Sequence, residues 1–238
     1  MGCVSETESV IVESAGAGSN GDLALRHRTD GHLELRANGI FVMDTQETST
    51  EKALATRALD LHRDPSHVLI GGLGLGFTLE AVLRDDRVAT VTVVEIEPRL
   101  VEWMREGRIP GGPELLEDER VRIEVADVAA VLEQSPAETY DLVLLDVDNG
   151  PGYLVHETNG ALYEAPALQD ARRVTAPGGT VVVWSAARAP ALLEVMGQVF
   201  DRAEALSYPV DLQGHTATYW LYVGWLSAGE TSPGNGTN

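Results

Sequence analysis

The sequence has little cysteine, few positive charges and no long hydrophobic run. Its single cysteine, Cys3, has no partner for a disulfide within the chain, which is typical of the reducing cytoplasm, so we expect a cytoplasmic protein. A membrane-spanning helix needs about 18 or more consecutive apolar residues, and the chain contains no such run. The opening residues MGCVSE lack the apolar core of a signal peptide. We therefore expect no membrane association.

Positive charge is scarce as well. Among 238 residues, 17 are Lys or Arg and 37 are Asp or Glu, which gives a net charge of −20. Such a surface repels phosphate backbones and anionic lipids, so nucleic acid and membranes are poor partners. A small cationic molecule would be attracted, although most acidic surfaces are simply solvated.

The two ends of the chain differ in composition from the middle. Residues 1–20 and 227–238 are rich in small and polar residues and are predicted to be flexible tails. Between 21 and 62 we expect a small β-strand module, with hairpin turns at Thr29-Asp30-Gly31 and Asn38-Gly39, followed by a helix. The segment Thr48-Ser49-Thr50-Glu51 matches a capping box at the start of that helix.

Residues 63–226 show a different pattern. The apolar runs HVLIGG, TVTVVEIE, VRIEVAD, YDLVLLDV and TVVVWSA mostly alternate with helical segments, which predicts an α/β domain with a mostly parallel sheet. AEALSYPV and TATYWLYVGW then resemble a final antiparallel pair. This is the pattern of a Rossmann-like class I methyltransferase fold, with an antiparallel last strand.

A glycine-rich loop follows the first of these strands. Gly71, Gly72, Gly74 and Gly76 allow close approach of a ligand to the backbone, and ligands bind at this edge of an open α/β sheet. A dinucleotide fingerprint starting at Gly72 would need its third glycine at position 77, where the chain has Phe77. The loop reads G-x-G-x-G, the form common where S-adenosylmethionine binds.

The next two strands end in acids that suit an adenosine. Glu95 lies about 20 residues beyond the loop, where an acid can accept the ribose hydroxyls. Asp127 can accept from the adenine amino group and Val128 can offer a backbone contact. Asp127 also precedes a helical segment, so it has an alternative role as a helix cap.

The fourth strand ends in a cluster of candidate catalytic and substrate residues. Asp146 and Asp148 are carboxylates that can position an amine or accept its proton, unless one of them caps the turn. Asn149, Tyr153 and His156 follow closely and are candidate substrate contacts, with surface or packing roles as the alternatives. Tyr163 has the same two interpretations, and for Trp184 core packing is the favoured one.

In this order and spacing, LELRANGIFVMD, HVLIGGLGLGFTLEAVL, VVEIEP, ADV and YDLVLLD resemble the spermidine synthase family of polyamine aminopropyltransferases. The catalytic motifs depart from it. Gly74 stands where the family has a loop acid, and Asn149 stands where it has the last Asp of D-S-S-D. Of the family's Tyr-His-Glu stretch only the acid has a counterpart, Glu51, which makes Glu51 a candidate substrate residue.

The resemblance implies an S-adenosylmethionine-dependent transferase with a small-molecule acceptor, which the charge suggests is cationic, and it implies a homodimer formed partly through residues 22–44. Because the departures fall on polyamine binding, the sequence favours methyl transfer, with Asp146 and Asp148 as catalytic residues. Aminopropyl transfer from decarboxylated S-adenosylmethionine is the alternative, and a noncatalytic adenosyl-binding or assembly protein is a second alternative. No spacing of metal ligands is visible, so we expect no metal.

Overall fold

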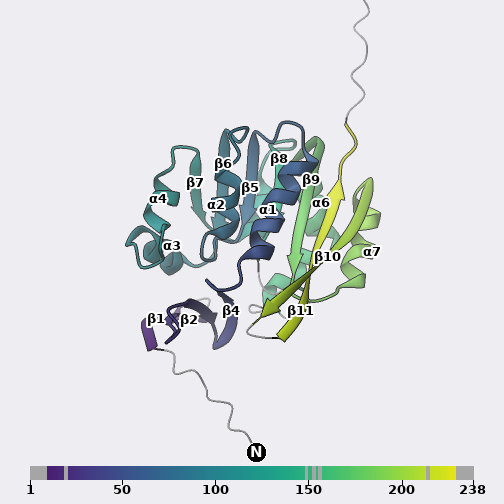
Figure 1. Cartoon of the computed structure of the whole chain (residues 1–238). Coiled ribbons are helices and arrows are strands. Elements are labelled where there is room, and N and C mark those ends of the chain that lie inside the picture. The colour runs from purple at the N-terminus through teal and green to yellow at the C-terminus, as the bar shows by residue number, and fades with distance from the viewer. Residues whose placement is uncertain are drawn as a thin grey trace, which may run out of the picture.

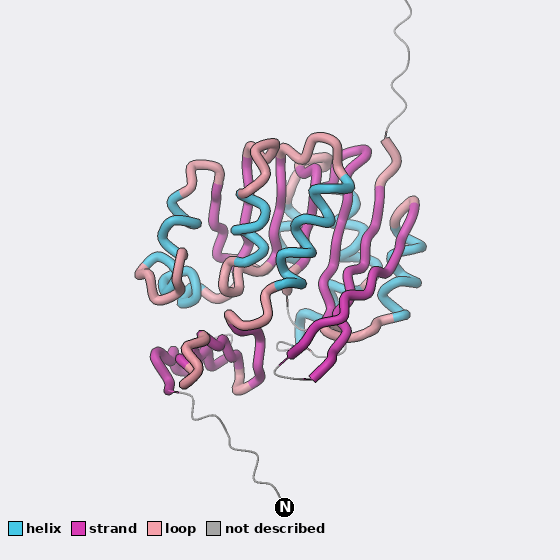
Figure 2. Tube along the Cα trace, in the orientation of Figure 1, coloured by secondary structure: helices cyan, strands magenta, loops and turns pink. Residues whose placement is uncertain are grey.

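Two β-sheets organise the part of the chain that the structure describes (Figure 1). The computed structural model describes residues 10–18, 21–147, 150–151, 154, 157–212 and 215–228. A small sheet near the N-terminus lies against one end of a larger sheet that carries helices on both faces (Figure 2). None of the described helices is long and apolar enough to cross a membrane.

The small sheet is antiparallel throughout. Its order is β1-β2-β3-β4, formed by β1 (Val10–Gly18), β2 (Gly21–His27), β3 (Leu33–Ala37) and β4 (Ile40–Asp44). The predicted Asn38-Gly39 turn is present, with φ of 53° and 76°, as a two-residue hairpin turn requires. Strand β1 lies within residues 1–20, where the sequence predicted a flexible tail, and it pairs antiparallel with β2.

The larger sheet has the order β10-β11-β9-β8-β5-β6-β7. Strands β5 to β9 are parallel, and β11 runs antiparallel to both β9 and β10. Its strands are β5 (His67–Gly71), β6 (Thr90–Glu95), β7 (Val121–Val125), β8 (Tyr140–Leu145), β9 (Thr175–Ser185), β10 (Arg202–Leu212) and β11 (His215–Trp225). The predicted class I methyltransferase fold with its final antiparallel pair is thus confirmed.

Alternation along the strands creates two apolar layers. Val68 and Ile70 face the layer of α1, α2 and α3, whereas Leu69 faces the layer of α5, α6 and α7. The helices are α1 (Ser49–Leu61), α2 (Phe77–Leu83), α3 (Pro98–Arg105), α4 (Gly112–Glu117), α5 (Val128–Gln134), η1 (Glu157–Tyr163), α6 (Ala165–Val174) and α7 (Pro190–Val199). The first layer also includes apolar side chains of the small sheet, among them Leu25 and Leu35. Burial therefore fixes that sheet against the larger one.

The start of α1 is not the capping box that the sequence predicted. Thr48 is the N-cap residue, but its side chain makes no capping hydrogen bond. Glu51 is buried, and its Oε2 accepts from the Oγ1 of Thr50 at 2.9 Å. Tertiary packing has turned this acid inward, toward the carboxyl end of β8.

Candidate functional site

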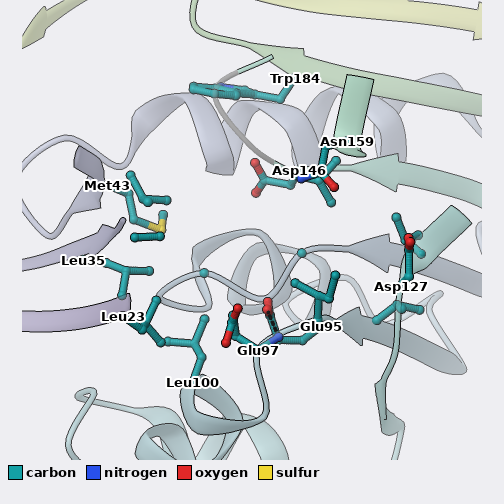
Figure 3. A pocket seen from close by; sticks show the side chains of 18 of the residues that line it. Leu23, Leu35, Met43, Glu95, Glu97, Leu100, Asp127, Asp146, Asn159 and Trp184 are labelled. Carbon is teal, nitrogen blue, oxygen red and sulfur yellow. Dashed lines mark hydrogen bonds between the residues drawn. The ribbon is translucent and has the colours of Figure 1, made fainter. Parts of the chain in front are cut away.

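A cavity lies at the carboxyl ends of β5, β6, β7 and β8, under the small sheet (Figure 3). The larger sheet contributes Glu95, Asp127 and Asp146, and helix α1 contributes Glu51. The small sheet contributes only apolar side chains among the residues described: Leu23, Leu35, Ala37, Val42 and Met43. The cavity therefore has an acidic side and an apolar side.

The glycine loop forms part of its wall. Gly72 has a φ of +94°, and a Cβ atom there would lie 2.1 Å from the carbonyl oxygen of Asp146, so only glycine fits. Gly74, with a φ of +51°, also lines the cavity. Gly71 packs against Val128 and Leu145 instead, and Gly76 is the left-handed N-cap of α2. Two of the four predicted glycines thus face the cavity and two serve packing and chain direction.

Glu95 is both a lining residue and a support for the loop. Its Oε2 accepts from the backbone N–H of Leu73 and its Oε1 from that of Glu97, each at 2.8 Å. Burial raises the pKa of the Glu95 carboxyl. A carboxylate has about four acceptor positions, so capacity remains for hydroxyl groups of a ligand. The acceptor oxygens of Glu95 and the glycine wall fit an adenosyl group.

Asp127 is a helix cap, which was the alternative role predicted from its position before a helical segment. Its Oδ1 accepts from the backbone N–H of Ala129 at 2.9 Å, which caps α5. It remains exposed and lines the cavity beside Val128, which packs on Gly71. Capping fixes the orientation of the Asp127 carboxylate, and its second oxygen stays available to a ligand.

Two carboxyl groups, those of Glu51 and Asp146, converge on the acidic side. Oδ2 of Asp146 accepts from the Oγ1 of Thr78 at 2.6 Å, and its backbone N–H donates to the carbonyl of Gly71 at 2.8 Å. Burial raises the pKa of Asp146 to about 6. Burial and the charge of Asp146 raise the pKa of Glu51 to about 7. Both pKa values therefore lie closer to neutral pH than those of free carboxyl groups.

Aromatic side chains lie near the acid pair. Trp184 lines the cavity on the side where Asp146 lies, and its exposed fraction is only 6% (Figure 3). Its ring meets that of Tyr219 edge to face, with centroids 5.0 Å apart. Burial and the nearby charge of Glu51 raise the pKa of Tyr219 to about 12. Trp184 is thus both a packed residue, as predicted, and part of the cavity wall.

The remaining predicted site residues divide into two groups. Asp148, Asn149, Tyr153 and His156 lie outside the described residues, so their roles stay predictions. Tyr163 is buried and its hydroxyl donates to the carbonyl of Val147 at 2.7 Å, which holds the chain just after Asp146. Tyr163 therefore positions the backbone next to Asp146.

Sequence reasoning missed Met43, Thr78, Glu97 and Tyr219. Thr78 had a signal, because it lies two residues after the last loop glycine, where α2 enters the site. Glu97 follows Glu95 by two residues and also lines the cavity. Met43 and Tyr219 come from distant hairpins and have no local signal. Within the described ranges, no three His, Cys, Asp or Glu side chains group as metal ligands.

Comparison with known proteins agrees with this architecture. The model of the spermine/spermidine synthase domain matches residues 35–202. Polyamine aminopropyltransferase 2 of Pseudomonas aeruginosa is 32% identical over 144 residues, which cover 59% of this chain and 39% of that protein. Putrescine N-methyltransferase 2 of Nicotiana tabacum is 31% identical over 118 residues, which cover 50% of this chain and 32% of that protein.

Solved structures show the same fold. A spermidine synthase in complex with the transition state analogue AdoDATO has a TM-score of 0.77 at 19% identity, covering 91% of this chain and 73% of that one. The spermidine synthase of Thermotoga maritima has a TM-score of 0.76 at 17% identity, covering 91% and 72%. The chain spans less than half the length of the two curated relatives named above. The family model, which matches most of the chain, shows that the chain belongs to the spermine/spermidine synthase family.

Proposed function

We propose that the chain transfers the aminopropyl group of decarboxylated S-adenosylmethionine to a nitrogen of a small polyamine. The observation that carries this proposal is the carboxyl pair of Glu51 and Asp146, placed beside the glycine loop with raised pKa values. Sequence analysis favoured methyl transfer, but the polyamine aminopropyltransferase and spermidine synthases among the relatives support aminopropyl transfer better.

The site residues divide the work between binding and proton transfer. Glu95 and Asp127 would hold the adenosine, while Gly72 and Gly74 let the ligand approach the backbone. When bound, the sulfonium supplies an electrophilic carbon. Asp146, oriented by Thr78, would hold the amine in line with that carbon.

The acid pair would accept the proton that the amine loses. An amine must lose a proton to become a nucleophile. Asp146, with a pKa of about 6, is mostly ionised at pH 7 and can accept that proton, whereas Glu51, with a pKa of about 7, is about half protonated there. The new C–N bond forms as the C–S bond breaks, and the nitrogen's proton passes to a carboxylate of the pair. Methylthioadenosine leaves as the neutral product.

Methyl transfer from S-adenosylmethionine is the second candidate. Gly74 favours it, because no acid stands on the loop to repel the extra carboxylate of the ordinary cofactor. A putrescine N-methyltransferase among the relatives supports it as well. The two reactions share the amine substrate and differ only in the group transferred.

Product analysis tests the proposal. The protein is incubated with putrescine and either sulfonium, and the products are identified by mass spectrometry. Spermidine formed only with decarboxylated S-adenosylmethionine is the expected result. N-methylputrescine formed with S-adenosylmethionine would establish the second candidate instead. No alkylated amine from a panel of diamines and triamines would contradict both and leave an adenosyl-binding protein without transferase activity.

A further inference from the structure

A side chain of the small sheet, that of Met43, contacts the glycine loop. The backbone N–H of Leu75 donates to the Sδ of Met43 at 3.2 Å. A Cβ atom at Gly74 would lie 2.7 Å from the same sulfur, well inside van der Waals contact. The thioether of Met43 therefore fills the space into which any side chain at position 74 would extend.

This part of the cavity is apolar. The side chains that β2, β3 and β4 contribute are Leu23, Leu35, Ala37, Val42 and Met43. The described carboxylates that line the cavity come from α1 and from the ends or loops of the larger sheet. Figure 3 shows those of the larger sheet, Glu95, Glu97, Asp127 and Asp146. If adenosine lies across Glu95 and Asp127, the sulfonium tail passes over Gly72 and Gly74, between Met43 and Asp146. One wall along the tail then offers dispersion contacts and no charge.

We propose that Met43 and Gly74 together form a neutral subsite for the tail of the adenosyl sulfonium. Met43 fills this subsite with an apolar side chain, so the subsite has no charged group that could distinguish the two cofactor tails. The proposal rests on the proposed function for the presence of that sulfonium. Charge-assisted hydrogen bonds distinguish ligands strongly, whereas a thioether is only a weak acceptor. The glycine loop by itself therefore separates the decarboxylated from the ordinary cofactor poorly.

An acid at position 74 would need two changes. Position 74 has a φ of +51°, in the left-handed region that Asp tolerates better than most residues. Its side chain would still collide with Met43 unless residue 43 becomes smaller. Met43→Ala/Gly74→Asp supplies both the room and the charge. Met43→Leu/Gly74→Asp is the matched control, because Leu keeps an apolar side chain of similar volume in the way.

The experiment is calorimetric titration of the full chain and these variants with S-adenosylmethionine, its decarboxylated form and methylthioadenosine. The measured quantity is the ratio of the two sulfonium dissociation constants. We expect Met43→Ala to keep the wild-type ratio within about threefold, because no charge is added. We expect Met43→Ala/Gly74→Asp to shift the ratio toward the decarboxylated form by about tenfold or more, and the Leu control to shift it much less.

Methylthioadenosine lacks the charged tail, so its affinity reports whether the adenosyl part of the site is intact in each variant. An unchanged ratio in Met43→Ala/Gly74→Asp, with methylthioadenosine still bound, would overturn the neutral subsite. A large shift caused by Met43→Ala alone would overturn it too. Failure of the wild-type chain to bind any of the three ligands would instead refute the adenosyl-binding function on which the inference rests.

Discussion

Glu95 joins the glycine loop to the end of β6. Its carboxylate accepts from two backbone N–H groups, those of Leu73 and Glu97, and its exposed fraction is 6%. Removing the side chain leaves both donors without this acceptor, the N–H of Leu73 in a buried place and that of Glu97 in a partly buried one. We therefore expect ligand affinity and loop stability to depend on the same residue.

We predict that Glu95→Ala weakens binding of methylthioadenosine by about tenfold or more and also lowers the free energy of unfolding. Each buried donor left unsatisfied costs about 1–3 kcal/mol. Calorimetry and urea denaturation measure the two effects. Glu114→Ala, on the exposed first turn of α4, is the control and should change neither. Unchanged ligand affinity in a folded Glu95→Ala protein would remove Glu95 from the binding site.

Glu51 makes the free energy of unfolding depend on pH. Its pKa rises from 4.5 to about 7 in the folded protein, so between these values the folded state binds more protons than the unfolded state. The free energy of unfolding therefore falls as pH rises through this window. The stabilising, protonated state of Glu51 is fully present below the unfolded pKa and is lost above pH 7.

We predict that Glu51→Gln raises the free energy of unfolding by roughly 1–3 kcal/mol at pH 8 and has little effect at pH 4, because Gln cannot ionise. Urea denaturation at a series of pH values gives the comparison. Glu133→Gln, exposed on α5, should follow the wild-type pH dependence. Parallel pH curves for wild type and Glu51→Gln would show that Glu51 is not the residue that titrates.

At the scale of elements, the stability of α2 depends on the glycine at its N-cap. Gly76, its N-cap, has a φ of +88°, and a Cβ there would lie 2.8 Å from Cε of Met104 and 3.0 Å from Cδ1 of Leu115. Gly111, the N-cap of α4, has a similar φ of +76° but open space around its Cβ position. Comparing substitutions at these two glycines therefore distinguishes the cost of a left-handed backbone from the cost of steric crowding.

We predict that Gly111→Ala costs about 1–2 kcal/mol of unfolding free energy from the left-handed backbone alone, and that Gly76→Ala costs more because packing is disturbed as well. Urea denaturation of both variants measures the difference. Gly76→Ala should also weaken binding of methylthioadenosine, since α2 carries Thr78 and follows the loop. Equal costs for the two variants would mean that the contacts of Gly76 with α3 and α4 do not matter.

Elements with local signals could be predicted from the sequence. The turns at Asp30-Gly31 and Asn38-Gly39, the alternating strands and the final antiparallel pair all follow from neighbouring residues. The local pattern at the start of α1 predicted a capping role for Glu51, which burial overrides, and only the family resemblance placed Glu51 in the site. The contact of Met43 with Leu75 joins residues 32 positions apart, so it depends on the packing of the two sheets.

At the scale of the whole molecule, the small sheet covers the cavity, and its own stability depends on what it packs against. Leu23, Leu25, Leu33 and Leu35 of β2 and β3 are buried, whereas Ile40 of β4 is 44% exposed. A sheet of this kind needs a covered hydrophobic face to be stable in water. The homodimer expected through residues 22–44 would add further burial, and it stays a prediction.

We predict a particle of twice the chain mass of 25.5 kDa in solution. Multi-angle light scattering at micromolar concentration measures it. Ile40→Glu should shift the population toward monomers if β4 is part of the interface, because it places a charge on an apolar contact. Thr56→Glu, on an exposed position of α1, is the control. A wild-type mass of one chain would contradict the dimer.

The most direct test of the central claim compares Asp146→Asn with the wild-type chain in alkyl transfer. Asn keeps the shape and an acceptor for Thr78 but cannot take a proton. The account predicts that kcat/KM for the amine falls by about 10²–10⁴-fold while affinity for methylthioadenosine stays within about threefold. Wild-type kcat/KM in a folded Asp146→Asn protein would contradict an amine bound and deprotonated by the Glu51–Asp146 pair.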